Sequence, residues 1–277
     1  MIAENIHLPT VKSFGEEWEA FTQEELSETE LKEVFEQYFK IFPWEKLPAN
    51  AVGFDMGCGT GRWAKFVAPR VGTLHLVEPS SALEVAKRAL SPFGNCEFHK
   101  ASLDTAPLDD NSMDFGYCLG VLHYVPDAQK GLTACATKLK PGAPLLVYVY
   151  YAFENRPLWF RFIWKMSDLV RRVISHLPFF AKYWSTQLIA ALVYFPVAKL
   201  SLLLEKLGVS VEWVPLSAYR KHSFYTMHTD AFDRFASPIE KRYTAQQLSA
   251  MMEQAGFERI RFNNSTPYWC AVGYRKK

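Results

Sequence analysis

The chain lacks the features that mark several common protein classes. Its 277 residues include only five scattered cysteines and no CxxC pair, which disfavours a disulfide framework and favours a reducing cytoplasm. The formal net charge of +2 disfavours a dedicated nucleic-acid binder. No basic head followed by an apolar run opens the chain, so we expect no secretory signal. With 49% hydrophobic residues, the chain can instead bury a sizeable core.

Charge and aromatic residues are unevenly distributed along the chain. Residues 1–50 carry eleven acidic and four basic side chains, whereas residues 156–207 carry two acidic and eight basic ones. Aromatic residues are concentrated in 151–235, where 18 of them occur. This composition predicts an insertion with a role of its own.

The N-terminal residues 1–45 read as helical. Apolar residues recur at helical spacing from Phe14 to Phe21 and again from Leu26 to Ile41, before Pro43. This pattern is compatible with helices packed on the core or with a lid over a pocket. We assign 1–45 as an N-terminal helical lid.

From residue 51 onward, strand patterns alternate with helix patterns. The expected strands are 51–55, 73–78, 96–100, 113–119 and 144–151, and the expected helices are 62–68, 82–90 and 128–139. Such alternation predicts a parallel sheet covered on both faces. A helix over 244–256 with Thr244 as its N-cap, followed by strands 257–262 and 268–274, closes the chain.

A glycine-rich loop follows the first of these strands. It reads DMGCGTG at 55–61; a dinucleotide-binding fingerprint would need glycine where Arg62 stands, and a P-loop would need a Lys-Ser/Thr pair. Glu78 ends the next strand, 21 residues after Gly57, where a carboxylate can accept both hydroxyls of a ribose. Together the two features predict a nucleoside-binding site.

These segments resemble the class I S-adenosylmethionine (SAM)-dependent methyltransferases, of the bacterial small-molecule type. The resemblance covers 46–151 and, by the order of elements, 236–277; it rests on FDMGCGTGR (54–62), LVEP (76–79), ASLDTAPLDDNSMD (101–114), LGVLHYVPD (119–127) and LKPG (139–142). It implies an α/β, doubly wound, seven-stranded mixed sheet with a Rossmann-like fold and a last strand that runs antiparallel. Residues 152–235 would be a helical, aromatic cap inserted after the fifth strand, on the substrate side.

The resemblance also implies SAM as the cofactor. It places Glu78 at the ribose, Ser102 and Leu103 at the adenine, and Arg62 at the carboxylate. The family often has an acid in place of Ser102, so Asp104 could supply that contact instead. The full set of expected cofactor-binding residues is Asp55, Gly57, Gly59, Arg62, Glu78, Ser102, Leu103 and Leu119. Asp55 could equally hold backbone amides of the loop, and Leu119 could belong to the core.

Two histidines are candidates for catalysis. An O or N acceptor must lose a proton, and His123, four residues beyond Leu119, is the best-placed base. The alternative for His123 is a hydrogen bond that caps the strand-to-helix turn. His228 lies in the polar and aromatic stretch 222–234, which we expect to be an ordered loop facing the substrate. No ligand spacing supports a metal site.

The insertion 152–235 contains two apolar stretches. Residues 159–177 predict an amphipathic helix with a basic side. Residues 188–204 are nearly all apolar, but this stretch is shorter than a membrane span and Pro196 would kink it. A buried helix or cap, an interfacial membrane contact and a span all remain open.

We therefore expect a cytoplasmic SAM-dependent methyltransferase acting on O or N of a small, hydrophobic or ring-containing acceptor, with O slightly preferred. One alternative is a lipid-linked acceptor, with peripheral membrane contact through 156–207. Another is a non-catalytic SAM-binding partner subunit. DNA is not an expected partner, because LGVLHY (119–124) replaces the Pro-Pro-aromatic motif of DNA-base methyltransferases; RNA is disfavoured by the modest charge. The oligomeric state stays open.

Overall fold

The computed structural model describes residues 5–21 and 27–277. These residues form two compact units. The first contains the described residues up to Phe21, Leu31–Ala152 and Lys241–Lys277. The second contains the described residues between 27 and 30 together with Phe153–Glu240. The second unit thus begins one residue later than the insertion expected from the sequence and ends five residues later.

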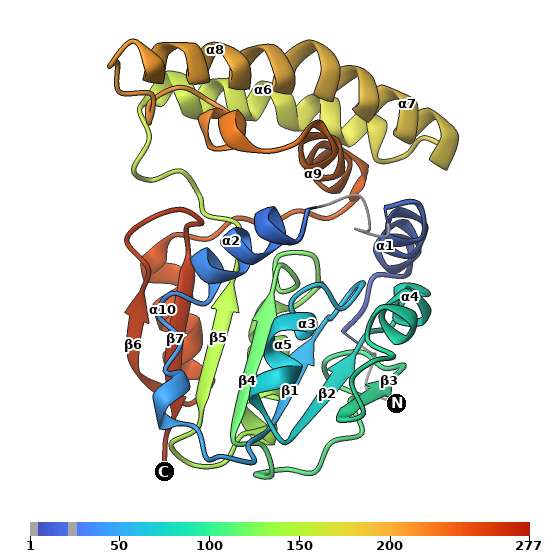
Figure 1. Cartoon of the computed structure of the whole chain (residues 1–277), viewed down its shortest axis with the longest axis vertical. Helices are drawn as coiled ribbons and strands as arrows, with labels where there is room; N and C mark the ends of the chain where they lie inside the picture. Colours follow the sequence, from blue (N-terminus) through green and yellow to red (C-terminus); the bar gives the residue numbers. More distant parts are fainter. Residues whose placement is uncertain (1–4, 22–26) are drawn as a thin grey trace. The chain divides into compact units, whose positions relative to one another are not determined.

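The first unit is built on a seven-stranded sheet in the order β3-β2-β1-β4-β5-β7-β6 (Figure 1). Strands β1 to β5 pair in parallel, and β7 runs antiparallel to both β5 and β6. The strands are β1 (Val52–Met56), β2 (Thr73–Val77), β3 (Cys96–His99), β4 (Phe115–Leu119), β5 (Pro144–Tyr148), β6 (Phe257–Phe262) and β7 (Cys270–Arg275). The predicted mixed sheet with an insertion after its fifth strand is confirmed.

Helices connect and cover these strands. They are α1 (Leu8–Ala20), α2 (Glu28–Tyr38), α3 (Ala64–Val67), α4 (Ala82–Ala89), α5 (Ala128–Lys138) and α10 (Ala245–Gln254), with short 3-10 turns at Trp44–Lys46 and Ala68–Arg70. Local chemistry sets their ends. The Asp127 side chain accepts from the Lys130 N–H at the start of α5, and Thr244 forms a capping box with Gln247 at the start of α10.

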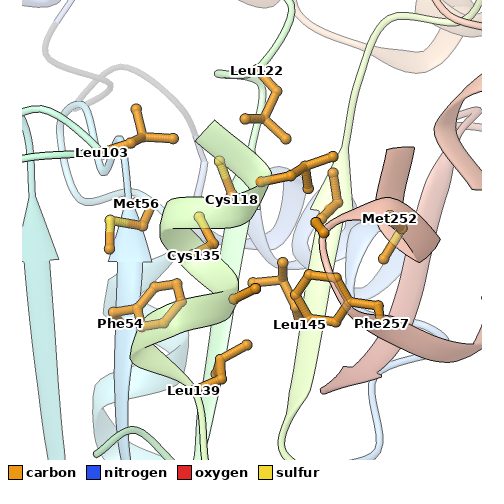
Figure 2. Packing of buried hydrophobic residues seen from close by; sticks show 14 of the residues in the cluster. Phe54, Met56, Leu103, Cys118, Leu122, Cys135, Leu139, Leu145, Met252 and Phe257 are labelled. Atoms are coloured by element: carbon orange, nitrogen blue, oxygen red, sulfur yellow. The ribbon is translucent and has the colours of Figure 1, made fainter. Parts of the chain in front are cut away.

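The main core lies between the sheet and helices α5 and α10. Every residue of β4 is buried, as expected for a strand covered on both faces. Figure 2 shows Cys135 of α5 and Met252 of α10 packed over strand residues such as Phe54 and Leu145. On the opposite face, Phe39 packs edge-on against Tyr117, with ring centroids 5.3 Å apart.

The strand order reverses direction between β1 and β4. From β1 the chain moves outward through β2 and β3, then returns to place β4 on the other side of β1. The connections at the carboxyl ends of β1 and β4 therefore diverge, which is where open α/β sheets bind ligands.

The second unit is helical. It comprises α6 (Leu158–Ile174), α7 (Phe179–Ile189), a π turn η3 (Ala190–Tyr194), α8 (Phe195–Lys206), the 3-10 helix η4 (Ser217–Lys221) and α9 (Phe224–Ala236). Its small core joins residues from these elements: Ile174, Ala190, Tyr194, Ala198, Met227, Ala231 and Phe235.

Our expectation of a loop over 222–234 was wrong, because α9 occupies most of it. The Ser223 side chain caps the helix by accepting from the Thr226 N–H at 3.2 Å. Met227, Ala231 and Phe235 then recur at helical spacing and are buried. The polar residues between them concealed this periodicity in the sequence.

The apolar stretch 188–204 is part of a longer helix than the sequence suggested. Helices α7 and α8 run through the π turn as one helix of 28 residues, Phe179–Lys206. The Phe195 N–H donates to the Ala190 carbonyl five residues back. A π turn shifts the hydrogen-bond register by one residue, which accommodates the missing N–H of Pro196.

Candidate functional site

The glycine loop turns at the carboxyl end of β1. Gly57, Gly59 and Gly61 have φ values of +82°, +54° and +77°, a region that favours glycine. The Gly57 and Cys58 N–H groups both donate to the Val77 carbonyl, at 2.8 and 3.2 Å. A Cβ at Gly57 would lie 2.3 Å from Val121 Cγ2. The loop is therefore clamped between β2 and the β4 connection.

The buried Glu78 carboxylate links the end of β2 to this loop. Its Oε2 accepts from the Gly59 N–H at 3.1 Å, and its Oε1 accepts from the Ser80 N–H at 3.0 Å. Because each carboxylate oxygen has a second lone pair, both retain capacity for a further donor. The sequence placed Glu78 and the glycines at one site, and the structure brings them into hydrogen-bond contact.

Asp55 lies beneath the loop at the end of β1, almost completely buried. Burial raises the pKa of its carboxyl from 3.8 to about 8, the Tyr117 hydroxyl partly opposes this, and the Glu78 charge adds to it. Its Oδ2 has no hydrogen-bond partner among the described residues. A buried acceptor without a partner is costly in a folded protein and indicates a place for a donor or a cation.

Arg62 and helix α1 cover the loop. The Arg62 guanidinium lies over the Trp63 ring at 4.4 Å and over the Trp18 ring at 5.4 Å. A Cβ at Gly59 would lie 3.5 Å from Trp18 Nε1. Farther along α1, Phe14 contacts Tyr124 edge-on at 4.8 Å. Helix α1 thus places two aromatic side chains along the carboxyl ends of the strands.

Ser102 is held by its own loop. Its hydroxyl donates to Asp104 Oδ1 at 2.8 Å and lies 2.8 Å from the Thr105 hydroxyl. Asp104 in turn pairs with Lys130 at 2.6 Å and accepts from the Asn5 N–H. The Ser102 hydroxyl, which the sequence assigned to an adenine contact, therefore donates its hydrogen within the loop.

Leu103 and Leu119 point into apolar surroundings. Leu103 belongs to the main core cluster, and its contact with the adenine stays a prediction. Leu119, at the carboxyl end of β4, is buried. Gly120 follows it with φ of +81°, and no atom lies within 4 Å of the position of a Cβ there.

His123 is fully buried in an aromatic cluster. Its ring stacks on Tyr150 at 4.0 Å and contacts Tyr124 at 4.2 Å. The Tyr150 N–H donates to Nδ1 at 3.4 Å, so the neutral ring carries its proton on Nε2. Burial and the Arg242 charge lower the pKa of His123 well below its usual value. The ring is thus poorly arranged to take up a proton, and its Nε2 has no hydrogen-bond partner among the described residues.

His228 belongs to the second unit. It lies on α9, where its ring contacts Tyr183 of α7 edge-on at 4.9 Å and its Nε2 lies 3.5 Å from the Thr186 hydroxyl. Burial lowers its pKa. His228 is therefore buried because it packs against α7 within the helical unit. Its contact with substrate stays a prediction.

Comparison with known proteins matches the part of the chain that holds the glycine loop and Glu78. Residues 54–147 match the family model described as a methyltransferase domain, which begins one residue before Asp55 and ends in β5. The chain therefore contains a methyltransferase domain. SAM is the methyl donor of this family.

Two curated relatives of this chain are also named as methyltransferases. A ubiquinone biosynthesis O-methyltransferase of Saccharophagus degradans is 33% identical over 37% of this chain and 43% of its own length. A ubiquinone/menaquinone biosynthesis C-methyltransferase of Francisella tularensis subsp. novicida is 25% identical over 80% of this chain and 73% of its own. The chain spans only 24% of a further relative from Synechococcus.

A solved structure shares the fold of this chain. A possible exported protein of Bordetella parapertussis superposes with a TM-score of 0.54 at 14% identity, covering 95% of this chain and 80% of its own.

The structure adds a site residue that the sequence did not single out. Tyr117 lies on β4 beside Asp55. The register of β1 and β4, which pairs Asp55 with Tyr117, is the signal that could have found it. Trp18, which the sequence already offers as a candidate wall of a pocket, lies over Gly59.

A cluster of metal-ligating side chains lies away from the glycine loop. His75 of β2 and Glu97 and His99 of β3 have ligand atoms within 4.8 Å of one another. His75 Nδ1 lies 3.1 Å from His99 Nε2 and 3.3 Å from Glu97 Oε2. Hydrogen bonding among the three accounts for this grouping, which becomes visible only from the β2–β3 register.

We predict that Glu78→Ala weakens SAM binding. Loss of a charged acceptor of two hydroxyls corresponds to roughly a tenfold to hundredfold increase in the dissociation constant, measured by isothermal titration calorimetry. Glu97→Ala, which removes an exposed carboxylate from the adjacent strand, is the matched control. Equal affinities of both variants, with circular dichroism unchanged, would contradict the assignment of Glu78.

We predict that Asp55 makes folding stability fall as pH rises. Its carboxyl binds a proton more tightly in the folded state, so the stabilisation is complete below the unfolded pKa of 3.8 and is lost as pH rises through about 8. Asp55→Asn has no such proton to lose. The urea midpoint of the wild type relative to this variant should therefore decrease from about pH 5 to about pH 9. A constant difference across this range would contradict the raised pKa.

Proposed function

We propose that this protein transfers a methyl group from SAM to an oxygen or nitrogen atom of a small, hydrophobic, ring-containing acceptor, with oxygen preferred. The observation that carries the proposal is the contact of the Glu78 carboxylate with the Gly59 N–H. This contact places a carboxylate of the kind that binds ribose hydroxyls next to a glycine loop, at the carboxyl ends of adjacent parallel strands.

The residues present suit SAM. Glu78 Oε1 and Oε2 have lone pairs for the ribose hydroxyls, and the partnerless Asp55 Oδ2 suits a ligand group that donates a hydrogen bond or carries positive charge. Arg62, held between two indole rings, would pair with the carboxylate. SAM supplies a methyl group on a cationic sulfur, an activated leaving group. The chain must orient the acceptor and exclude water.

An aromatic cluster in the first unit supports a ring-shaped acceptor. Tyr38 contacts Tyr148 edge-on at 4.9 Å and Trp63 at 5.1 Å. Tyr148 in turn contacts Tyr150, which stacks on His123. Through Trp63 the cluster adjoins Arg62 and the glycine loop. Aromatic side chains with a few polar atoms are typical of sites for apolar, ring-containing ligands.

The names of the relatives agree with this acceptor class. The Saccharophagus protein is named for O-methylation and the Francisella protein for C-methylation, both in quinone biosynthesis. We propose oxygen because an acidic phenol or quinol hydroxyl places little demand on a general base, and His123 is not arranged to act as one.

The test uses SAM with a deuterated methyl group and a panel of quinols, phenols and aromatic amines. We expect the label on the oxygen of a quinol or phenol, detected by mass spectrometry and located by NMR, and product from Glu78→Ala only at correspondingly higher SAM concentrations. Label on ring carbon, or turnover of amines alone, would overturn the preference for oxygen. Tight SAM binding without transfer to any acceptor would favour the non-catalytic alternative.

We predict that His123 acts as a positioning residue. His123→Ala should lower kcat by about tenfold, the value of one buried hydrogen bond, with SAM affinity unchanged. His123→Asn can still accept from the Tyr150 N–H and should restore most of kcat. A loss of turnover in both variants, together with loss of a pH-rate limb, would instead establish His123 as the base.

A further inference from the structure

Large apolar side chains cover the outside of the second unit. Of the exposed large hydrophobic residues in the described part of the chain, all except Leu8 lie between Leu158 and Trp213. Large exposed apolar patches are rare on monomeric soluble proteins and mark interaction surfaces. We call this patch the outer face and define it by α6, α7, η3, α8 and the segment up to Trp213.

On α6 the usual orientation of an amphipathic helix is inverted. Its exposed apolar residues fall within a sector of roughly 140° around the axis at 100° per residue. They are Leu158, Trp159, Phe162, Ile163, Met166, Leu169, Val170 and Val173. The buried side instead carries Arg171, which pairs with Asp168 at 2.7 Å and donates to the Ser237 carbonyl. Large apolar groups point outward, whereas the buried residues of the helix are Arg171 and Ile174.

The long helix α7–η3–α8 shows the same inversion. Its exposed side carries Phe180, Trp184, Leu188 and Leu192, then Leu200, Leu203 and Leu207 beyond the π turn. Its buried side carries Lys182, Thr186, Ala190, Tyr194, Ala198 and Ser201. Small and polar residues between helices, with large apolar residues outside, are typical of helices packed in lipid. The apolar window in this helix has mean hydropathy 1.8 and is only 22% buried.

Basic side chains border the outer face. The exposed Arg161, Lys165 and Arg172 form one row along α6 beside its apolar sector. The acidic Asp168 is neutralised by Arg171 and Arg172, at 2.7 and 3.0 Å. Such a row can reach lipid phosphates while the apolar sector enters the acyl region. The exposed Trp159, Trp184 and Trp213 suit the interface between headgroups and acyl chains.

We propose that the outer face binds the surface of an anionic lipid bilayer, with α6 and α7–α8 lying in the plane of the membrane. A surface position is favoured over a span because α9, which contacts both α6 and α7, carries Asp230, Asp233 and Arg234. Three ionisable side chains on a helix that packs against both are costly in the hydrocarbon region. This inference does not rest on methyl transfer.

The test is co-sedimentation of the full chain with vesicles of phosphatidylcholine alone or mixed with phosphatidylglycerol. We expect binding to both, stronger to the anionic vesicles, weakened by salt and reversed by alkaline carbonate. The double variant Met166→Glu, Leu192→Glu should lose binding without unfolding, because both side chains are exposed. Leu8→Glu is the matched control: it changes an exposed leucine outside the outer face and should bind as the wild type does.

A second variant set tests the basic row. Arg161→Gln, Lys165→Gln and Arg172→Gln together should weaken binding to anionic vesicles roughly a hundredfold, about tenfold or less per charge, and leave binding to neutral vesicles unchanged. Removing three exposed lysines of the first unit, Lys12→Gln, Lys32→Gln and Lys276→Gln, should have little effect.

Three results would overturn the proposal. Absence of vesicle binding, with self-association that Leu192→Glu abolishes in sedimentation velocity, would assign the outer face to a second copy of the chain. If the protein shows neither vesicle binding nor self-association, the outer face would instead be assigned to a different protein partner. Resistance to alkaline carbonate would show a span instead of a surface contact. SAM affinity, measured on the same samples, should stay unchanged in every variant and separates this test from that of the proposed function.

Discussion

The hydrogen bond from the Gly59 N–H to Glu78 ties together the elements on which the site depends. It joins the loop after β1 to the end of β2, and it forms because the two strands are parallel neighbours whose carboxyl ends coincide. The same arrangement brings the Asp55 carboxyl so close to Glu78 that the negative charge of Glu78 contributes to the raised pKa of Asp55. Two acids and a glycine loop are therefore held in a small volume, and one of the two carboxyls retains its proton near neutrality.

That compromise suits a cationic ligand. A site that is partly protonated without its ligand can become more negative when a positive group arrives, because the ligand stabilises the ionised form. The two units then have separate tasks. In the proposed function the sheet unit would hold the charged groups of the cofactor, whereas the helical unit presents an apolar exterior. A bilayer contact would bring the enzyme to a phase in which hydrophobic acceptors concentrate.

Much of this could be predicted from the sequence, since the signals are local. Each strand pattern, the glycine loop and the acidic residue that follows β2 involves only a few consecutive residues. The periodicity of the strand patterns predicts the sheet, and the positions of the loop and of the acidic residue predict the site. The Thr244 capping box is local too. What failed depends on partners distant in sequence: α9 is a helix because Met227 and Phe235 find a core, and the protonation of His123 follows from the Tyr150 backbone. The inverted burial of α6 cannot be read from periodicity, which shows that a helix has two sides but not which side faces inward.

The contact between Gly57 and Val121 constrains how this loop can evolve. A side chain at position 57 would collide with a branched residue that follows β4 and would also have to adopt a left-handed backbone. Shortening the neighbour relieves the collision but not the backbone strain. No single substitution therefore allows another residue at position 57. Related proteins that differ in the rest of the domain are expected to keep this glycine, and residue 121 is expected to vary only among side chains that fit beside it.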